Sequence, residues 1–320
     1  PANRMVADTF AIVMTATHCE PLLLNTASEW DRKTMGEWNY DTNRAKMNEV
    51  LSGRVREASP YENVYPLALR GLHDAVMADG IPMKEKVRML SEAISDQRKI
   101  IAEQVAGPVE EIPQAFTPYK EVLEIYSNGL ELPDDVTIVW PDDNYGYLKR
   151  LSGPAERKRS GRSGVYYHVS YLGVPHSYLW FSTTPPALMY EELKKAYDTT
   201  ADRFWLLNCG DLKGCEMQVS LFMDMGYNID AFTAERVAEY PARWLSGFFG
   251  EAMYDDLFRN YDRFLTLSFS RKPEYMGWGY HWNHYANGCE QLTDTDFSLV
   301  SYNEAQRRLT ACSEVGRYAQ

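Results

Sequence analysis

The 320-residue sequence has few cysteines and few histidines. Its five cysteines have scattered spacings, without the paired C-x-x-C pattern of zinc sites or the density of a disulfide-rich fold. We therefore expect free thiols, with no disulfide among Cys19, Cys209 and Cys215. The six histidines form no His-x-His or His-Glu-x-x-His pattern. The sequence thus favours a protein with no metal site and no cofactor.

Positive charge and long apolar runs are also lacking. The net charge of −12 disfavours a nucleic-acid backbone or an anionic membrane as a partner. No run approaches the roughly 20 apolar residues that span a bilayer. An apolar content of 45% and a charged content of 24% are ordinary for a globular protein. The 22 tyrosines and 8 tryptophans suit core packing and also stacking on sugars.

Short apolar runs alternate with helical patterns through the first 230 residues. The predicted strands are Thr9–Thr15, Asn63–Leu69, Ala115–Tyr119, Val136–Trp140, Val165–Tyr171 and Arg203–Asn208. The predicted helices among them are Lys84–Val105, Tyr119–Tyr126, Pro186–Tyr197 and Glu216–Tyr227. This alternation predicts a mainly parallel sheet. We expect an α/β fold in which residues 1–230 form a (β/α)8 TIM-type barrel whose first two strands precede Pro1.

Strand patterns stop near residue 230. From there the sequence predicts the helices Phe232–Glu251, Met253–Ser268 and Asn303–Gln320. Residues 231–320 are therefore predicted to be a helical region that begins a helical-bundle domain.

Ionisable or amide side chains follow all six predicted strands. The stretch 136–147 shows this most clearly, since an apolar run ends at a proline and continues into Asp142, Asp143 and Asn144. A (β/α) barrel gathers the carboxyl ends of its strands at one face. We therefore expect one face to collect a set of six residues: His18, Asp74, Glu121, Asp142, His168 and Asn208.

Many carboxylates in one pocket suit glycoside hydrolysis, which needs two carboxyl groups flanking the scissile bond. The catalytic candidates are Asp74, Glu121, Glu29 and Asp142. Arg70 and Lys120 add positive charge, which an acidic sugar requires because a buried carboxylate needs a cationic partner. A metal-dependent barrel hydrolase is the weaker alternative, because no metal-ligand spacing accompanies the acids.

Several long and unusual strings resemble glycoside hydrolase family 115, the xylan α-glucuronidases. They include Thr17-His-Cys-Glu-Pro21, Leu69-Arg-Gly-Leu-His-Asp74, Pro118-Tyr-Lys-Glu-Val-Leu-Glu124, Val139-Trp-Pro-Asp-Asp-Asn-Tyr-Gly-Tyr147 and Ser163-Gly-Val-Tyr-Tyr-His-Val-Ser-Tyr171. Together with shorter matches they extend from about residue 10 to residue 227. The resemblance implies an inverting exo-enzyme that removes α-1,2-linked glucuronic acid, or its 4-O-methyl ether, from xylan.

The resemblance also implies a set of pocket residues. They are Glu29, Arg70, Asp74, Glu121, Asp142, Asn144, His168, Tyr171 and Asn208. We favour Asp74 and Glu121 as the catalytic pair, with their roles open. The substrate-binding candidates are His18, Arg70, Lys120, Asn144, His168, Tyr171 and Asn208. Family strands with an Asn-Asp-Glu type motif, which hold a further candidate carboxylate, are expected ahead of Pro1.

Other properties stay open or rest on the predicted substrate. A non-catalytic carbohydrate-binding homologue with a truncated or degenerate barrel is the alternative to an enzyme. The expected partner is a glucuronic-acid-substituted polysaccharide or oligosaccharide, and the expected location is secreted or periplasmic. Glucuronic acid versus its methyl ether, xylan versus arabinogalactan, and monomer versus homodimer are not separated by the sequence.

Overall fold

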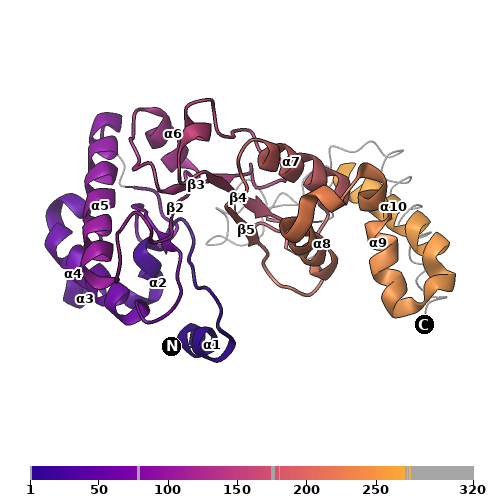
Figure 1. Ribbon diagram of the computed structural model, residues 1–320, viewed down its shortest axis with the longest axis horizontal. Coiled ribbons are helices and arrows are strands. Elements are labelled where there is room, and N and C mark those ends of the chain that lie inside the picture. The colour runs from indigo at the N-terminus through magenta and orange to yellow at the C-terminus, as the bar shows by residue number, and fades with distance from the viewer. Residues whose placement is uncertain are drawn as a thin grey trace, which may run out of the picture. The chain divides into compact units, whose positions relative to one another are not determined.

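The computed structural model describes residues 2–77, 80–173, 177–179, 181–270, 272 and 274 (Figure 1). The chain divides into two compact units. The first unit contains Pro1–Pro141, Arg150–Val165 and Thr199–Phe204, and the second contains Asp142–Lys149, Tyr166–Asp198 and Trp205–Gln320. The predicted Asn303–Gln320 helix lies outside the described residues, and the domain boundary predicted at residue 230 stays a prediction.

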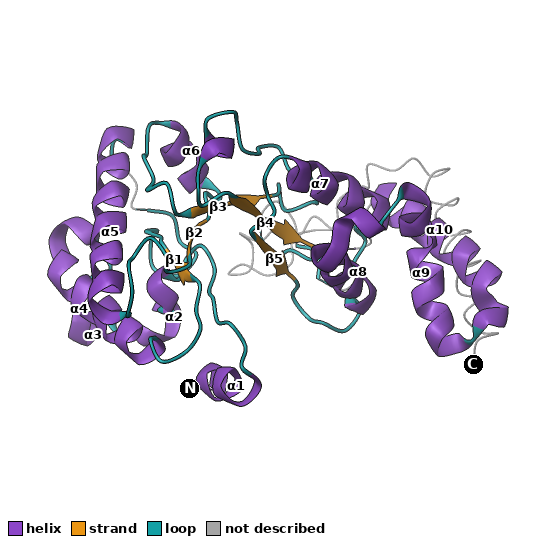
Figure 2. Ribbon diagram, viewed as in Figure 1, coloured by secondary structure: helices purple, strands orange, loops and turns teal. Residues whose placement is uncertain are grey.

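The described residues form a five-stranded sheet whose strands follow one another in chain order (Figure 2). The strands are β1 (Tyr65–Pro66), β2 (Gln114–Phe116), β3 (Thr137–Pro141), β4 (Ser163–His168) and β5 (Phe204–Asn208). The β1–β2 and β2–β3 pairs are parallel, with Tyr65 opposite Gln114 and Ala115 opposite Thr137. Consecutive parallel strands joined through helices are the arrangement of a (β/α) barrel, so this mixed α/β fold agrees with part of one.

Burial explains why the strand signal was readable. Every residue of β3 and β4 is buried, so these segments are mainly apolar and show no alternation of apolar and polar residues. Five of the six predicted strands are confirmed, with their ends shifted by no more than three residues. Thr9–Thr15 was wrong as a strand: Ala2–Phe10 is helix α1, and Met14 makes a single parallel bridge to Asn63. The β-branched run there has one paired position, and strands depend on neighbours more than on propensity.

The first unit also contains six helices among its described residues. They are α1, α2 (Thr26–Glu29), α3 (Arg32–Met35), α4 (Tyr40–Ala58), α5 (Met83–Gln104) and α6 (Glu121–Ser127), with 3₁₀ turns at Pro21–Leu23 and Glu156–Lys158. The sequence predicted α5 and α6 but missed α4, which the Asn39 side chain caps by accepting from the amides of Asp41 and Thr42. Helices α4 and α5 pack together, and their buried Leu51 and Leu90 join one apolar core.

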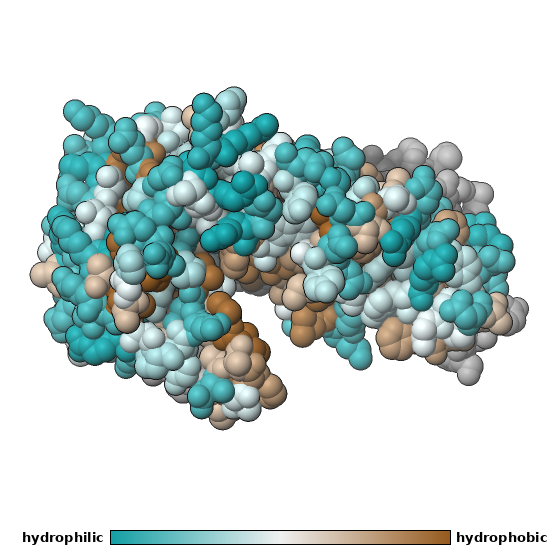
Figure 3. Space-filling view, in the orientation of Figure 1, coloured by the Kyte–Doolittle hydropathy of each residue, from teal (hydrophilic) through white to brown (hydrophobic). Residues whose placement is uncertain are grey.

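Apolar residues also gather over α1 and the segment after it (Figure 3). Met5, Phe10, Ile12 and Val13 are exposed there. This surface belongs to the first unit and includes none of the candidate site residues.

The second unit is mainly helical. It contains α7 (Pro186–Asp198), α8 (Glu216–Asn228), α9 (Ala234–Phe249) and α10 (Tyr254–Ser270), with 3₁₀ turns at Ile229–Ala231 and Glu251–Met253. All four helices were predicted, and α9 packs on α7 and α10. Within the described part of the chain, no helix combines the length and the apolar character that crossing a membrane requires.

Candidate active site

Arg70 organises a charged cluster in the first unit. It lies four residues beyond β1, and its side chain is 1% exposed. Its Nε and Nη2 each donate a hydrogen bond of 2.8 Å to the two carboxylate oxygens of Glu121, the first residue of α6. Its Nη1 donates to Oδ1 of Asp74. One buried guanidinium therefore holds both favoured catalytic carboxylates.

Asp74 collects two further partners besides Arg70. His18 Nε2 lies 3.0 Å from Oδ1 of Asp74, and Lys120 Nζ lies 3.0 Å from Oδ2. Burial raises the pKa of Asp74, but the hydrogen bonds from His18 and Lys120 and the nearby positive charges outweigh it. The pKa of Asp74 therefore lies well below its usual range, and this carboxylate stays ionised at neutral pH. We call His18, Arg70, Asp74, Lys120 and Glu121 the Arg70 cluster.

His18 is the neutral member of the Arg70 cluster. Burial lowers its pKa, although the hydrogen bond with Asp74 acts in the opposite direction. Its ring also packs against Tyr119, with 4.3 Å between ring centroids. A neutral imidazole beside an ionised carboxylate carries its proton on the facing nitrogen, so His18 Nε2–H donates to Asp74.

Two residues other than glycine, one in this cluster and one beside it, have a left-handed backbone conformation. Lys120 has φ 52° and His73 has φ 56°. Such conformations cost about 1–3 kcal/mol and persist where surrounding contacts fix them. The His73 amide donates 2.8 Å to the Thr26 hydroxyl, which fixes the turn just before Asp74. Lys120 is fixed by its ion pair to Asp74 at the start of α6.

Two residues of the Arg70 cluster and the neighbouring Cys19 have side chains that can bind a metal ion. Ligand atoms of His18, Cys19 and Asp74 lie within 4.8 Å of one another. Arg70 and Lys120 already neutralise Asp74, and a cation there would compete with both. These residues do not fit a metal site.

A second group of candidates lies in the second unit and is centred on Asp142. The side chain of Asp142 is 0% exposed. Its Oδ1 lies 2.5 Å from Nδ1 of His168 and accepts from the amide of Asn144 at 3.0 Å. Its Oδ2 accepts from the amides of His168 at 3.0 Å and Gly146 at 3.1 Å. This carboxylate therefore fixes the orientation of His168 and the fold of the loop 142–149.

The remaining candidates of this group adjoin His168. The Tyr166 and His168 rings lie 4.6 Å apart, and the Asn208 side chain donates 2.6 Å to the Tyr166 hydroxyl. Tyr171 stands edge-on to His168 with centroids 5.8 Å apart. We call Asp142, Asn144, His168, Tyr171 and Asn208 the Asp142 cluster. Of the six residues predicted to converge, three belong to the Arg70 cluster and three to the Asp142 cluster. Convergence of all six stays a prediction.

Glu29 lies apart from the Arg70 cluster in its described contacts. It pairs with Arg54, and its Oε2 accepts from the Asn25 amide at 2.9 Å. Glu29 and Arg54 line a cavity of about 610 Å³ in the first unit, together with Glu20 and Asn63. The place of Glu29 in catalysis stays a prediction, and its pairing with Arg54, 25 positions further along the chain, was not predicted.

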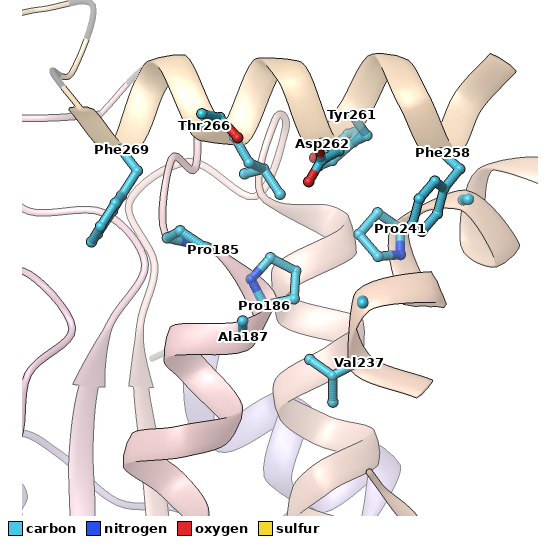
Figure 4. A pocket seen from close by; sticks show the side chains of 13 residues that line it. Pro185, Pro186, Ala187, Val237, Pro241, Phe258, Tyr261, Asp262, Thr266 and Phe269 are labelled. Carbon is cyan, nitrogen blue, oxygen red and sulfur yellow. The ribbon is translucent and has the colours of Figure 1, made fainter. Parts of the chain in front are cut away.

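Another cavity, of about 340 Å³, lies in the second unit between α7, α9 and α10 (Figure 4). Its walls are mostly apolar, with Val237, Pro241, Phe258 and Phe269 among them and Asp262 as the charged side chain in the lining. No candidate site residue lines it. A pocket with one carboxylate and apolar walls is not suited to an acidic sugar.

Comparison with known proteins identifies the family to which this constellation belongs. A sequence profile described as glycosyl hydrolase family 115 matches residues 1–275. A solved structure described as a family GH115 4-O-methyl-α-glucuronidase with specificity for decorated arabinogalactans is similar, at 37% sequence identity and a TM-score of 0.90. The match covers 99% of this chain and 42% of that one. A search of curated proteins found no match. The chain belongs to glycosyl hydrolase family 115.

Proposed function

We propose that the protein is an α-glucuronidase that removes α-1,2-linked glucuronic acid, or its 4-O-methyl ether, from xylan or a related polysaccharide with inversion. The family assignment and the glucuronidase of similar structure support the reaction class. The observation that carries the proposal is the bridge from Arg70 to both Asp74 and Glu121. Hydrolysis of a glycosidic bond uses two carboxyl groups that flank the scissile bond, and Arg70 binds two such groups.

The two carboxylates differ in the roles that suit them. The lowered pKa of Asp74 makes it a poor proton donor at neutral pH, so we assign it the base that activates water. Glu121 is then the proton donor to the departing sugar oxygen. Because both Glu121 oxygens accept from Arg70, carrying a proton requires the loss of one of those hydrogen bonds when substrate binds.

Lys120 is better placed than Arg70 to meet the substrate's carboxylate. The Arg70 guanidinium is buried and occupied on both sides, whereas the Lys120 side chain is 34% exposed. A compact ammonium also offers three donors, and Asp74 uses one of them. We therefore assign Lys120 to the uronate and Arg70 to holding the catalytic pair.

The test uses the full-length protein with an aldouronic oligosaccharide and a glucuronate-decorated arabinogalactan. Release of glucuronic acid or its methyl ether is followed by chromatography, and proton NMR during early turnover identifies the anomer. Inversion at an α-linkage gives the β-anomer first. Sugar release by wild type that is lost in Asp74→Asn and Glu121→Gln supports the proposal, while the α-anomer as first product refutes inversion.

The alternative, a carbohydrate-binding homologue without turnover, predicts a different result. Calorimetry would then show oligosaccharide binding by wild type with no released sugar. We further propose a secreted or periplasmic location, because the substrate is a polysaccharide, and fractionation of the native host tests it. Whether the protein forms a homodimer is tested by light scattering.

A further inference from the structure

Tyr178 connects two loops of the second unit that carry candidate residues. Its side chain is buried, and its hydroxyl donates to the main-chain carbonyl of Asn144. Its main chain forms an antiparallel bridge with Tyr171, with both N–O distances at 2.9 Å. The Tyr145 ring also packs on it, with 5.5 Å between ring centroids. Tyr178 therefore touches the segments that present Asn144 and Tyr171.

Lys272, which follows α10, lies over the ring of Tyr178. Its Nζ is 3.9 Å from the ring centroid, and it donates a hydrogen bond of 2.7 Å to the Thr183 hydroxyl. A cation at this distance over a tyrosine ring is attracted by the ring's negative face. Burial lowers the pKa of Lys272 to about 8, although Glu274 acts in the opposite direction. The protein thus keeps a lysine where burial disfavours its charge.

The position of Asn144 shows what this arrangement must hold. Asn144 has φ 72°, which is a left-handed conformation in a residue other than glycine. Its amide is fixed by Asp142 and its carbonyl by Tyr178. A strained residue keeps its conformation only while its surroundings determine it. If the Tyr178 ring moves, one of these two constraints is lost.

We infer that Lys272 is a positioning residue: its ammonium and its bond to Thr183 hold the Tyr178 ring, and that ring fixes Asn144 and Tyr171 for substrate. This role rests on the proposed function, because it concerns the geometry of that site. Lys272 acts through Tyr178 and does not itself need to touch substrate. None of the patterns in the sequence predicts this role for Lys272.

The first test compares Lys272→Met, Lys272→Arg and the control Lys194→Met in the full-length enzyme. Lys194 is a partly exposed lysine of α7 that pairs with Asp198. We expect Lys272→Met to lower kcat on an aldouronic oligosaccharide by about tenfold, and Lys272→Arg to restore most of it because arginine keeps the charge over the ring. Lys194→Met should match wild type. Equal kcat for wild type and Lys272→Met would overturn the inference.

Coupling to Tyr178 separates positioning from a general loss of structure. Tyr178→Phe removes the hydroxyl bond to Asn144 and keeps the ring. We expect the double variant with Lys272→Met to lose no more activity than the more affected single variant, because both act on one constraint. Losses that multiply would contradict the inference.

Hydrogen exchange provides a readout that does not need turnover. Lys272→Met should speed amide exchange in residues 142–149, where the Asn144 and Gly146 amides are bonded to Asp142, and leave α5 unchanged. Unchanged exchange in 142–149 would overturn the inference even if no activity were found. Wild type without glucuronidase activity but with faster exchange in the variant would refute the proposed function alone.

Discussion

Two aspartate–histidine pairs, one in each unit, differ in almost everything except their residue types. Asp74 faces His18 at 3.0 Å, and Asp142 faces His168 at 2.5 Å. The Asp74 side chain is 43% exposed and is surrounded by positive side chains, whereas Asp142 is 0% exposed. Three of the four hydrogen bonds that Asp142 accepts come from main-chain amides.

The difference in exposure and partners suits Asp74 to the proposed chemistry and Asp142 to holding its loop. Asp74 keeps access to solvent, so it can reach water and substrate. The carboxylate oxygens of Asp142 accept hydrogen bonds from the loop that carries Asn144 and from the ring of His168. A catalytic role for Asp142 stays a prediction, and its hydrogen bonds are those of a residue that fixes its surroundings. The first predictions ask whether the two pairs separate activity from stability in this way.

The largest expected effect is on turnover at Asp74. Asp74→Asn removes the base but keeps the shape of the side chain, so kcat should fall by about 10²–10⁴, the range for loss of a general acid or base. The free energy of unfolding should also fall, because His18, Lys120 and the buried Arg70 lose the ionised carboxylate that they stabilise, although Arg70 keeps both bonds to Glu121. Initial rates on an aldouronic oligosaccharide and urea unfolding measure the two quantities.

A matched control for this variant is Asp202→Asn, which changes another partly exposed aspartate that pairs with an arginine, Arg162. It should leave kcat at the wild-type value. Asp74→Asn with more than a tenth of wild-type activity would remove Asp74 from the catalytic pair.

The next largest effect is on stability at Asp142. Asp142→Ala leaves three main-chain amides and the His168 ring without their acceptor, which should lower the free energy of unfolding by about 3–5 kcal/mol. Urea unfolding followed by circular dichroism measures this loss. An unfolding free energy within about 1 kcal/mol of wild type would mean that the loop does not depend on this carboxylate.

The sequence predicted those parts of the fold whose burial is uniform. Strands β3 and β4 are buried throughout, and their ends were predicted to within three residues. Helix α5 has apolar residues at helical spacing and was placed within one residue at each end. Helix α4 was missed because polar residues interrupt its apolar face and its start depends on the Asn39 cap. Thr9–Thr15 failed because its β-branched run has a single paired position.

The sequence predicted candidates for the site, but it could not predict the contacts that these candidates make. Polar residues after strand ends are visible in any sequence, and Asp74, Glu121 and Asp142 were found in this way. Their roles depend on contacts between positions far apart, such as the 51 positions that separate Arg70 from Glu121. The amides that enclose Asp142 belong to the main chain and leave no mark on residue type. For the same reason Lys272, 94 positions from Tyr178, was not predicted as a site residue.

A smaller effect should distinguish the two cations of the Arg70 cluster. Lys120→Ala should lower kcat/KM on an aldouronic oligosaccharide by about 10–100-fold, the scale for loss of one charged hydrogen bond. A second substrate, in which a neutral glucosyl group replaces the glucuronosyl group, should show a smaller loss in kcat/KM. That substrate has no carboxylate to pair with Lys120. Arg70→Ala should weaken transition-state binding by about 2–5 kcal/mol for both substrates alike, because both proposed catalytic carboxylates lose a partner.

The comparison comes from kcat/KM of wild type, Lys120→Ala and Arg70→Ala on each of the two substrates. A uronate-selective loss in Arg70→Ala with an unselective loss in Lys120→Ala would exchange the two assignments. Equal losses on both substrates in both variants would leave the recognition of the acidic sugar to other residues.

The smallest expected effect is the pH dependence of stability at His18. Because burial lowers the pKa of His18 in the folded protein, the unfolded chain binds a proton first as the pH falls below about 6.5. Stability is therefore lost from about pH 6.5 down to the folded-state pKa, with a slope of at most about 1.4 kcal/mol per pH unit for one proton. His18→Gln keeps a donor for Asp74 and removes this titration, so its stability curve should be flatter in that window. Asp74 affects stability in a lower pH range. Its lowered pKa stabilises the fold above about pH 3.9, and that stabilisation is lost as the pH falls further. Urea unfolding of wild type and His18→Gln between pH 4.5 and 7.5, as chosen conditions, measures the difference. Parallel curves would show that His18 is not held in its neutral form by the fold.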